Sequence, residues 1–110
     1  MRGLILLAFL AGPVPAAGPD AATRSLIATQ CAACHVVPGI PGAVGKVGPS
    51  LRGIARQRMI AGRLPNTPGN MARWLMHPQR IDPGNAMPDM GLTQGQADRI
   101  TAYLMKVEQR

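Results

Sequence analysis

The stretch Cys31-Ala32-Ala33-Cys34-His35 decides how the rest of the chain is read. It holds the only two cysteines among 110 residues, and a histidine follows them directly. Two thiols at this C-x-x-C-H spacing lie about one helical turn apart, where they can add to the two vinyl groups on one side of a porphyrin, and the adjacent imidazole suits the iron. The motif therefore predicts one covalently attached haem c, with Cys31 and Cys34 as attachment points and His35 as the first axial ligand.

Three other interpretations of the cysteine pair are weaker. A disulfide across two intervening residues closes too small a loop to stabilise much. A thioredoxin-like redox pair needs a strand before the motif and a βαβ pattern around it, and the sequence has neither. A structural zinc site needs a second ligand pair, yet the only other imidazole is His77, which has no partner at suitable spacing.

The first residues have the features of an export signal. Arg2 precedes the apolar run 4–11, and a helix-breaking, small-residue segment follows it, which is the order found in cleavable signal peptides. The run is shorter than the ~20 residues that span a bilayer. Cleavage after Ala16 fits the small-residue rule best. We therefore expect a signal peptide over 1–16 and one domain over 17–110, exported to a bacterial periplasm and not transmembrane after cleavage.

The composition indicates a small basic protein that depends on a cofactor. With 13 Gly, 11 Pro and one each of Trp, Tyr and Phe, the chain has little apolar volume for a core, and a buried prosthetic group would supply it. The formal charge of +7 predicts redox partner proteins with acidic docking surfaces. The Arg and Lys residues are scattered singly, without an aromatic stacking platform, so we expect no nucleic acid partner. We also expect a monomer.

The residue pattern predicts an all-α fold of three to five short helices with long loops, because no period-two alternation and no internal repeat occur. Segment 36–50 is too rich in Gly and Pro for regular structure. The expected helices are one over about 21–31 capped by Asp20 or Thr23, one or two turns within 51–61, one opened by Thr67-Pro68 and ending before Pro78, and one from Thr93, with Gln96 in a capping box, to about Val107. Their apolar inner faces are Leu26 and Ile27, then Met71, Trp74 and Leu75, then Ala97, Ile100, Tyr103, Leu104 and Val107.

A haem that only transfers electrons takes a second protein ligand, often a thioether. Four methionines fall within the expected helices, where core packing explains them: Met59, Met71, Met76 and Met105. Met87 and Met90 lie instead in the loop 82–91, where Pro83 and Pro88 bracket Met87 and stiffen the chain around it. Met87 is therefore the favoured second ligand, Met90 the next, and His77 a weaker rival.

Taken together, these residues resemble a class I cytochrome c, the monohaem c-type family. Segment 60–74 with Met87 is most similar to the cytochrome domain fused to subunit II of some bacterial haem–copper oxidases. Here we expect that domain to stand alone, since no cysteine remains for a binuclear copper site. The motifs occur in family order and span nearly all of 17–110: Cys31-Ala-Ala-Cys34-His35, Gly48-Pro49-Ser50-Leu51, Pro83-Gly84-Asn85-Ala86-Met87-Pro88 and Ala102-Tyr103-Leu104.

The resemblance implies the class I cytochrome c fold and a role for each matching residue. Cys31 and Cys34 would carry the thioether bonds, with His35 and Met87 as axial ligands of the iron. The Pro49 carbonyl would accept the other ring N–H of His35, Trp74 would pack beside the haem, and Arg56 or Arg58 would face a propionate unless both are solvated surface charges. Thr23 and Ile27 stand where the family usually has a glycine and often an aromatic residue, so we expect the first and last helices to sit farther apart.

The implied function is electron transfer, to a terminal oxidase or from a periplasmic dehydrogenase, or with another cytochrome, without catalysis. Two alternatives stay open. The chain would be a haem subunit of a larger redox complex, or a peroxidase-type or gas-binding haem protein with Met87 displaced. Arg63 and His77 are the available distal residues for the second alternative, although they form no evident Arg–His pair.

Overall fold

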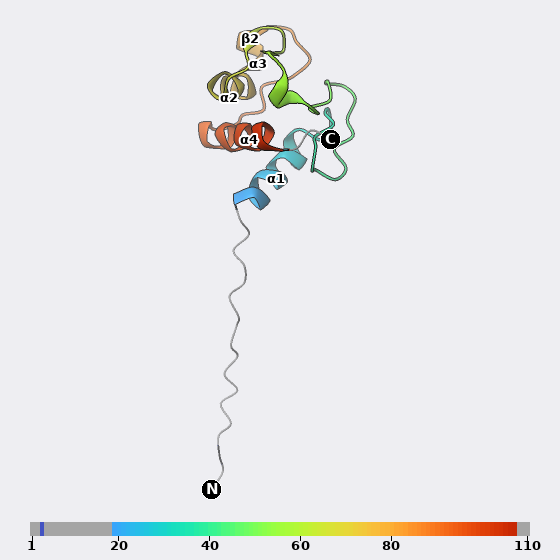
Figure 1. Cartoon of the computed structure of the whole chain (residues 1–110), viewed down its shortest axis with the longest axis vertical. Coiled ribbons are helices and arrows are strands. Elements are labelled where there is room, and N and C mark those ends of the chain that lie inside the picture. Colours follow the sequence, from blue (N-terminus) through green and yellow to red (C-terminus); the bar gives the residue numbers. More distant parts are fainter. Residues whose placement is uncertain (1–2, 4–18, 108–110) are drawn as a thin grey trace.

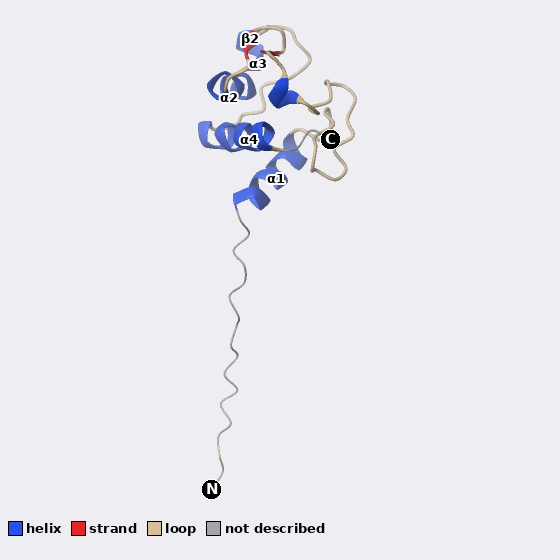
Figure 2. Cartoon of the chain, viewed as in Figure 1, coloured by secondary structure: helices blue, strands red, loops and turns tan. Residues whose placement is uncertain are grey.

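The computed structural model describes residue 3 and residues 19–107; the predicted signal peptide over 1–16 lies outside these residues, apart from Gly3. Figures 1 and 2 show helices joined by long loops. The all-α class is confirmed. No helix in the described part is both long and apolar enough to cross a bilayer. The elements are α1 (Pro19–Gln30), the 3-10 turn η1 (Ile54–Arg56), β1 (Met59–Ile60), β2 (Leu64–Pro65), α2 (Pro68–Met76), α3 (Pro78–Ile81) and α4 (Gln94–Lys106).

Helix α4 is the centre of the fold, because it packs against α1, α2 and η1 (Figure 1). Its predicted inner face is confirmed for Ala97, Ile100 and Leu104, which are all buried. The predicted capping box is also confirmed. The Thr93 hydroxyl accepts the Gln96 N–H at 3.2 Å, and Gln96 Oε1 accepts the Thr93 N–H at 2.9 Å, which satisfies two helix-end donors that would otherwise lack partners.

Helix α1 begins earlier than predicted. It starts at Pro19, so Asp20 lies in its first turn and Thr23 lies inside the helix; neither residue is the cap that the sequence suggested. Thr23 instead faces the crossing with α4 and is 4% exposed. Ile27 and Ile100 are fully buried there. These side chains are thus shielded from solvent, and the wider crossing expected from Thr23 and Ile27 stays a prediction.

Helix α2 follows its predicted start and face. The Thr67 hydroxyl accepts the Asn70 N–H at 3.1 Å, and Pro68 occupies the first helical position. The predicted inner side chains are buried: Met71, Trp74 and Leu75. The helix ends at Met76, and after His77 the chain forms the one-turn helix α3, which was not predicted.

Segment 51–61 contains one helical turn, Ile54–Arg56, within the one or two turns predicted. The hairpin that follows, in which β1 pairs antiparallel with β2, was not predicted. The reason is local: Ala61 and Gly62 adopt positive φ values of 51° and 66°, a conformation that reverses the chain and stops a helix. Met59 is therefore a strand residue, 42% exposed, and its interpretation as a helical core residue was wrong.

The loop after the cysteine motif is tied to both terminal helices. Arg24 Nη2 on α1 donates to the Gly39 carbonyl at 2.6 Å, and the Tyr103 hydroxyl on α4 donates to the Pro38 carbonyl at 2.6 Å. Val36 and Val44 also form an isolated antiparallel bridge. These contacts fix a glycine- and proline-rich segment that has no regular structure of its own.

The Tyr103 hydrogen bond predicts a pH-dependent effect of the Tyr103→Phe variant. At pH 7 the holoprotein should lose about 1 kcal/mol of unfolding free energy, since the Pro38 carbonyl loses its donor. Burial raises the pKa of Tyr103 above its ordinary value of 10.0, with Arg24 opposing the rise and Asp20 adding to it. The native state thus favours the protonated phenol, and the wild type alone loses this stability as the pH rises above 10.0. Guanidinium unfolding should show the difference shrinking between pH 7 and about pH 11; a constant difference would contradict the assignment.

Candidate haem-binding site

The cysteine motif forms a tight turn at the end of α1. The Cys31 N–H donates to the Ile27 carbonyl at 2.8 Å, which continues the helical pattern into the motif. The N–H groups of Cys34 and His35 then both donate to the Cys31 carbonyl, at 3.1 and 3.0 Å. Both cysteines are half-buried free thiols. The turn therefore holds two thiols and one imidazole close together, as the spacing predicted.

The surroundings of Cys31 differ from those of a redox-active pair. Burial raises the pKa of the Cys31 thiol to about 11, and the neighbouring Cys34 adds to the rise. Reactive C-x-x-C thiols have lowered pKa values, because the thiolate is the nucleophile. No cluster of three or more His, Cys, Asp or Glu side chains suitable for a metal exists among the described residues. The raised pKa of Cys31 is thus unlike that of a thioredoxin-like pair.

His35 is held by the segment that follows the loop. Its Nδ1 lies 2.6 Å from the Pro49 carbonyl oxygen, the contact that the sequence analysis expected. Because a carbonyl only accepts, Nδ1 carries the proton in this contact, and Nε2 is the ring nitrogen left for a metal. The Gly48 N–H donates to the Cys34 carbonyl at 2.7 Å, so the chain runs directly alongside the motif here.

Two glycines make this close approach possible, and the sequence analysis gave them no role. A Cβ on Gly48 would collide with the imidazole ring of His35, and a Cβ on Gly45 would lie 2.5 Å from the Ala33 oxygen and the Cys34 carbonyl carbon. Real Cβ atoms do not approach other atoms so closely. Both lie in a glycine-rich loop, and the sequence alone does not show which glycines of this loop face the motif.

The predicted second ligand lies in a half-buried apolar region. Met87 and Met90 both pack against the core while keeping accessible surface. Leu51 and Leu64, which lie earlier in the sequence, also pack against the core while keeping accessible surface. Trp74 is buried among the core residues. The core therefore has a border of partly exposed apolar side chains drawn from segments far apart in the sequence.

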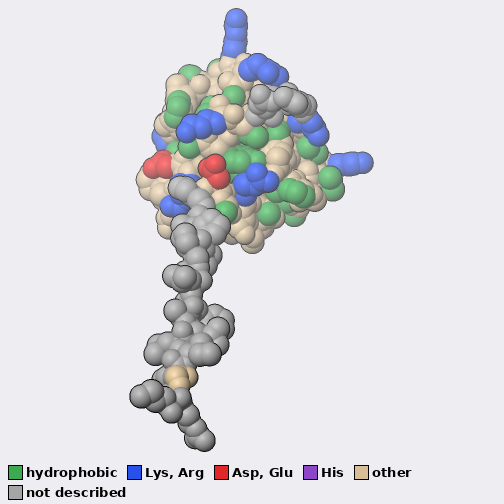
Figure 3. All heavy atoms as spheres, turned by 60° about the horizontal axis from the view of Figure 1, so that its bottom comes forward, with side chains coloured by type: hydrophobic (Ala, Val, Ile, Leu, Met, Phe, Trp, Pro, Cys, Tyr) green, Lys and Arg blue, Asp and Glu red, His purple; other side chains and the backbone are tan. Residues whose placement is uncertain are grey.

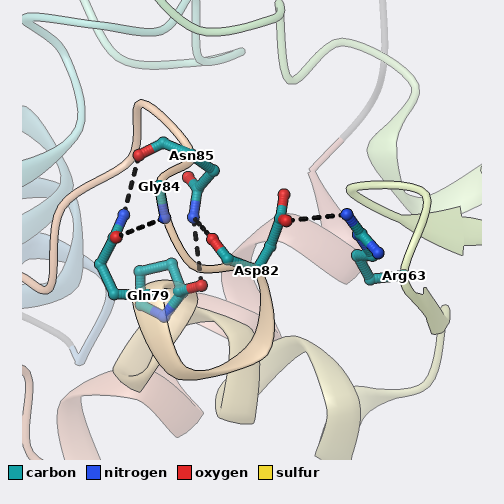
Figure 4. Close-up of polar contacts among 6 residues, drawn as sticks. Arg63, Gln79, Asp82, Gly84 and Asn85 are labelled. Atoms are coloured by element: carbon teal, nitrogen blue, oxygen red, sulfur yellow. Dashed lines mark hydrogen bonds and ion pairs between the residues drawn. The ribbon is translucent and has the colours of Figure 1, made fainter.

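The Met87 loop is fixed by a polar cluster that the sequence analysis missed. The side chains of Gln79 on α3 and Asn85 in the loop hydrogen-bond to the loop backbone (Figure 4). Asp89 accepts the backbone N–H of Gln79 at 3.2 Å. Asp82 pairs with Arg63 at 2.9 Å. A one-turn helix has no apolar periodicity to reveal it, which is why Gln79 could not be recognised from the pattern.

The other candidate residues lie at the surface or at helix ends. Arg56 and Arg58 are exposed. Arg63 is engaged with Asp82. His77 joins α2 to α3, since its N–H donates to the Arg73 carbonyl and its own carbonyl accepts the Ile81 N–H. His77 is therefore the residue at which one helix ends and the next begins.

The comparison with known protein families decides the class. The family model described as "Cytochrome c" matches residues 21–108. The chain belongs to the cytochrome c family. It therefore carries a covalently bound haem c with its iron, and the predicted family and cofactor are confirmed.

Two known proteins place the chain within this family. Cytochrome c oxidase subunit 2 from Bacillus sp. (strain PS3) is 33% identical over 83 residues, covering 72% of this chain. The chain corresponds to only 23% of that relative's length. The crystal structure of the c-type cytochrome SorU from Sinorhizobium meliloti shares the fold, with a TM-score of 0.56 at 21% identity over 84% of this chain and 93% of that one.

The site of this cytochrome c fits its haem in donor chemistry and in packing. Two thiols one turn apart suit the vinyl groups, and an imidazole with a fixed tautomer suits the iron. Gly48 leaves the His35 ring in contact with backbone alone on one side, a space that any Cβ would fill.

This contact predicts that Gly48→Ala destabilises the holoprotein, by about 1–3 kcal/mol. The new methyl group must push the His35 ring away from the Pro49 carbonyl, and the Gly48 backbone has no positive φ that would add strain of its own. Thermal unfolding of the holoprotein would measure the loss. Gly69→Ala is the matched control, because nothing lies within 4 Å of that position in α2 and alanine is the better helix former. Equal stability of the two variants would contradict the packing argument.

Proposed function

We propose that this cytochrome c is an exported carrier of single electrons with a closed coordination sphere. Cys31 and Cys34 would hold the haem through thioether bonds, and His35 Nε2 and the Met87 sulfur would be the two protein ligands of its iron. The observation that carries the proposal is the contact of His35 Nδ1 with the Pro49 carbonyl, because it orients the imidazole in the tautomer that a metal ligand requires.

In this function, other residues of the chain have to keep the side chains of His35 and Met87 in fixed positions. The bound haem supplies the one-electron chemistry. Pro49 and Gly48 keep the His35 ring in one orientation. The Met87 loop would supply the second ligand and exclude small molecules from the iron. Because neither ligand side chain would have to move, little rearrangement would accompany a change of oxidation state.

The peroxidase-type alternative is less well supported by the contacts of its candidate residues. Arg63 is an exposed side chain bound to Asp82, and an arginine that stabilises peroxide chemistry would need to reach the iron. His77 is the joint between two helices. The subunit alternative is favoured by the likeness to subunit 2 of an oxidase. In either of the two electron-transfer functions, the residues of the site have the same roles.

The partner surface that we propose surrounds the cysteine motif. The Gly45 backbone lies against Ala33 and Cys34, so its neighbours Val44 and Lys46 border the haem attachment site. Val44 and Val47 are 70% and 72% exposed, more than other large apolar side chains in the described part. Figure 3 shows one face of the molecule, on which Lys and Arg side chains are scattered singly and outnumber Asp and Glu. Such a face suits an acidic redox protein with a small apolar contact area in the periplasm.

The ligand assignment predicts different spectra for two methionine variants. The oxidised wild type should show the far-red thioether–iron band, and the reduced protein should not bind carbon monoxide. Met87→Ala should lose the band and gain carbon monoxide binding, whereas Met90→Ala should retain wild-type behaviour. The reverse result would transfer the ligand role to Met90. Carbon monoxide binding by the wild type would favour the enzyme or gas-binding alternative.

The docking surface predicts a charge-dependent electron-transfer rate for Lys46→Glu. Reduction of ferricyanide by this variant should slow about threefold at low salt, and reduction of tris(phenanthroline)cobalt(III) should accelerate, since the field beside the haem changes sign. Both changes should vanish at high ionic strength. Arg99→Glu is the control, because it makes the same change of charge outside the proposed docking surface. Arg99 lies on α4 near Asp20 and Arg24. If both variants change the rates equally, only net charge matters and this docking surface is wrong.

A further inference from the structure

The side-chain amide of Gln79 forms hydrogen bonds to the backbone of the Met87 loop, and Figure 4 shows those to Gly84 and Asn85. Its Nε2 donates to the Asn85 carbonyl at 2.8 Å and to the Met87 carbonyl at 2.8 Å. Its Oε1 accepts the Gly84 N–H at 3.1 Å. One amide therefore spans the loop from Gly84 to Met87, and two of these bonds are partly buried.

The side chain of Asn85 forms further hydrogen bonds to backbone groups of the Met87 loop and of α3. Its Oδ1 accepts the Met87 N–H at 2.7 Å. Its Nδ2 donates to the carbonyls of Asp82 and Pro78, at 2.7 and 3.1 Å. Both backbone polar groups of Met87 are thus bound by side-chain amides, one from α3 and one from the loop itself. Within the described part, the backbone of Met90 has no such side-chain hydrogen bond.

We propose that Gln79 and Asn85 are positioning residues that hold Met87 on the iron. This inference rests on the proposed ligand role of Met87. A loop of small and proline residues has little side-chain packing, so its conformation depends on where its N–H and C=O groups bind. Fixing both groups of one residue limits the positions open to its sulfur. The amides therefore set how readily the thioether leaves the iron.

A competing ligand measures this hold directly. In Gln79→Met, which keeps the length of the side chain but removes its hydrogen bonds, imidazole should bind the oxidised holoprotein about tenfold more tightly, because the loop opens more often. Hydrogen exchange at 84–87 should accelerate in the same variant. Gln94→Met is the matched control, since the Gln94 amide binds only Asp98 on the exposed face of α4, and both readouts should stay at wild-type values.

Gln79→Glu gives a second test with a pH profile. Its protonated carboxyl can donate to the Met87 carbonyl, whereas its carboxylate would face two carbonyl oxygens and repel them. The thioether band should therefore be strong at acidic pH and weaken between about pH 4 and 7, a change absent from Gln79→Met. A merely structural role would produce no such profile.

The outcomes separate this inference from the proposed function. Unchanged imidazole affinity and unchanged exchange in Gln79→Met would overturn the positioning role while leaving Met87 as the ligand. A Met87→Ala variant with a wild-type band would overturn the ligand assignment and with it the inference, even if exchange at 84–87 still accelerated in Gln79→Met. If Gln79→Met does not fold, a pH-independent band in Gln79→Glu would overturn the inference by itself.

Discussion

The hydrogen bond between His35 Nδ1 and the Pro49 carbonyl is the constraint on which the rest of this cytochrome depends. It requires the chain to leave the motif, turn, and return within 14 residues to the imidazole that it has just passed. A loop of that composition cannot hold such a path alone. Arg24 and Tyr103 tie it to the helices on both sides, so the α1–α4 crossing fixes the loop and the loop fixes the ligand.

The core explains why so small a chain needs its prosthetic group. Among the described residues, the buried apolar side chains are mostly Ala, Val, Ile and Leu, and Trp74 is the one large aromatic. Small domains bury a limited fraction of their surface and are correspondingly marginal. The core has a partly exposed apolar border, which includes Leu51, Leu64 and Met87. A haem packed against this border would be part of the core as well as the redox group.

Sequence reasoning succeeded where one local signal controls the structure. Residue types at fixed spacing predicted the Thr67 and Thr93 caps and the buried faces of α2 and α4. The contact of His35 with Pro49 was implied by the resemblance to class I cytochromes c. Sequence reasoning failed where an element is too short to show a pattern, and where a contact with another helix decides. The hairpin of β1 and β2 is two residues per strand, too short for alternation to show. Helix α3 is a single turn, too short for an apolar pattern. Thr23 is buried inside α1 and does not cap it.

The two ligand supports that we infer share one chemical property. Pro49 offers a backbone carbonyl to His35, and Gln79 and Asn85 offer amides to the backbone of Met87. None of these groups titrates near neutral pH. A carboxylate in any of these positions would place a fixed charge beside the iron and would make the ligand geometry depend on pH. Neutral supports on both sides hold the geometry constant while the charge of the iron changes, which is what an electron carrier requires.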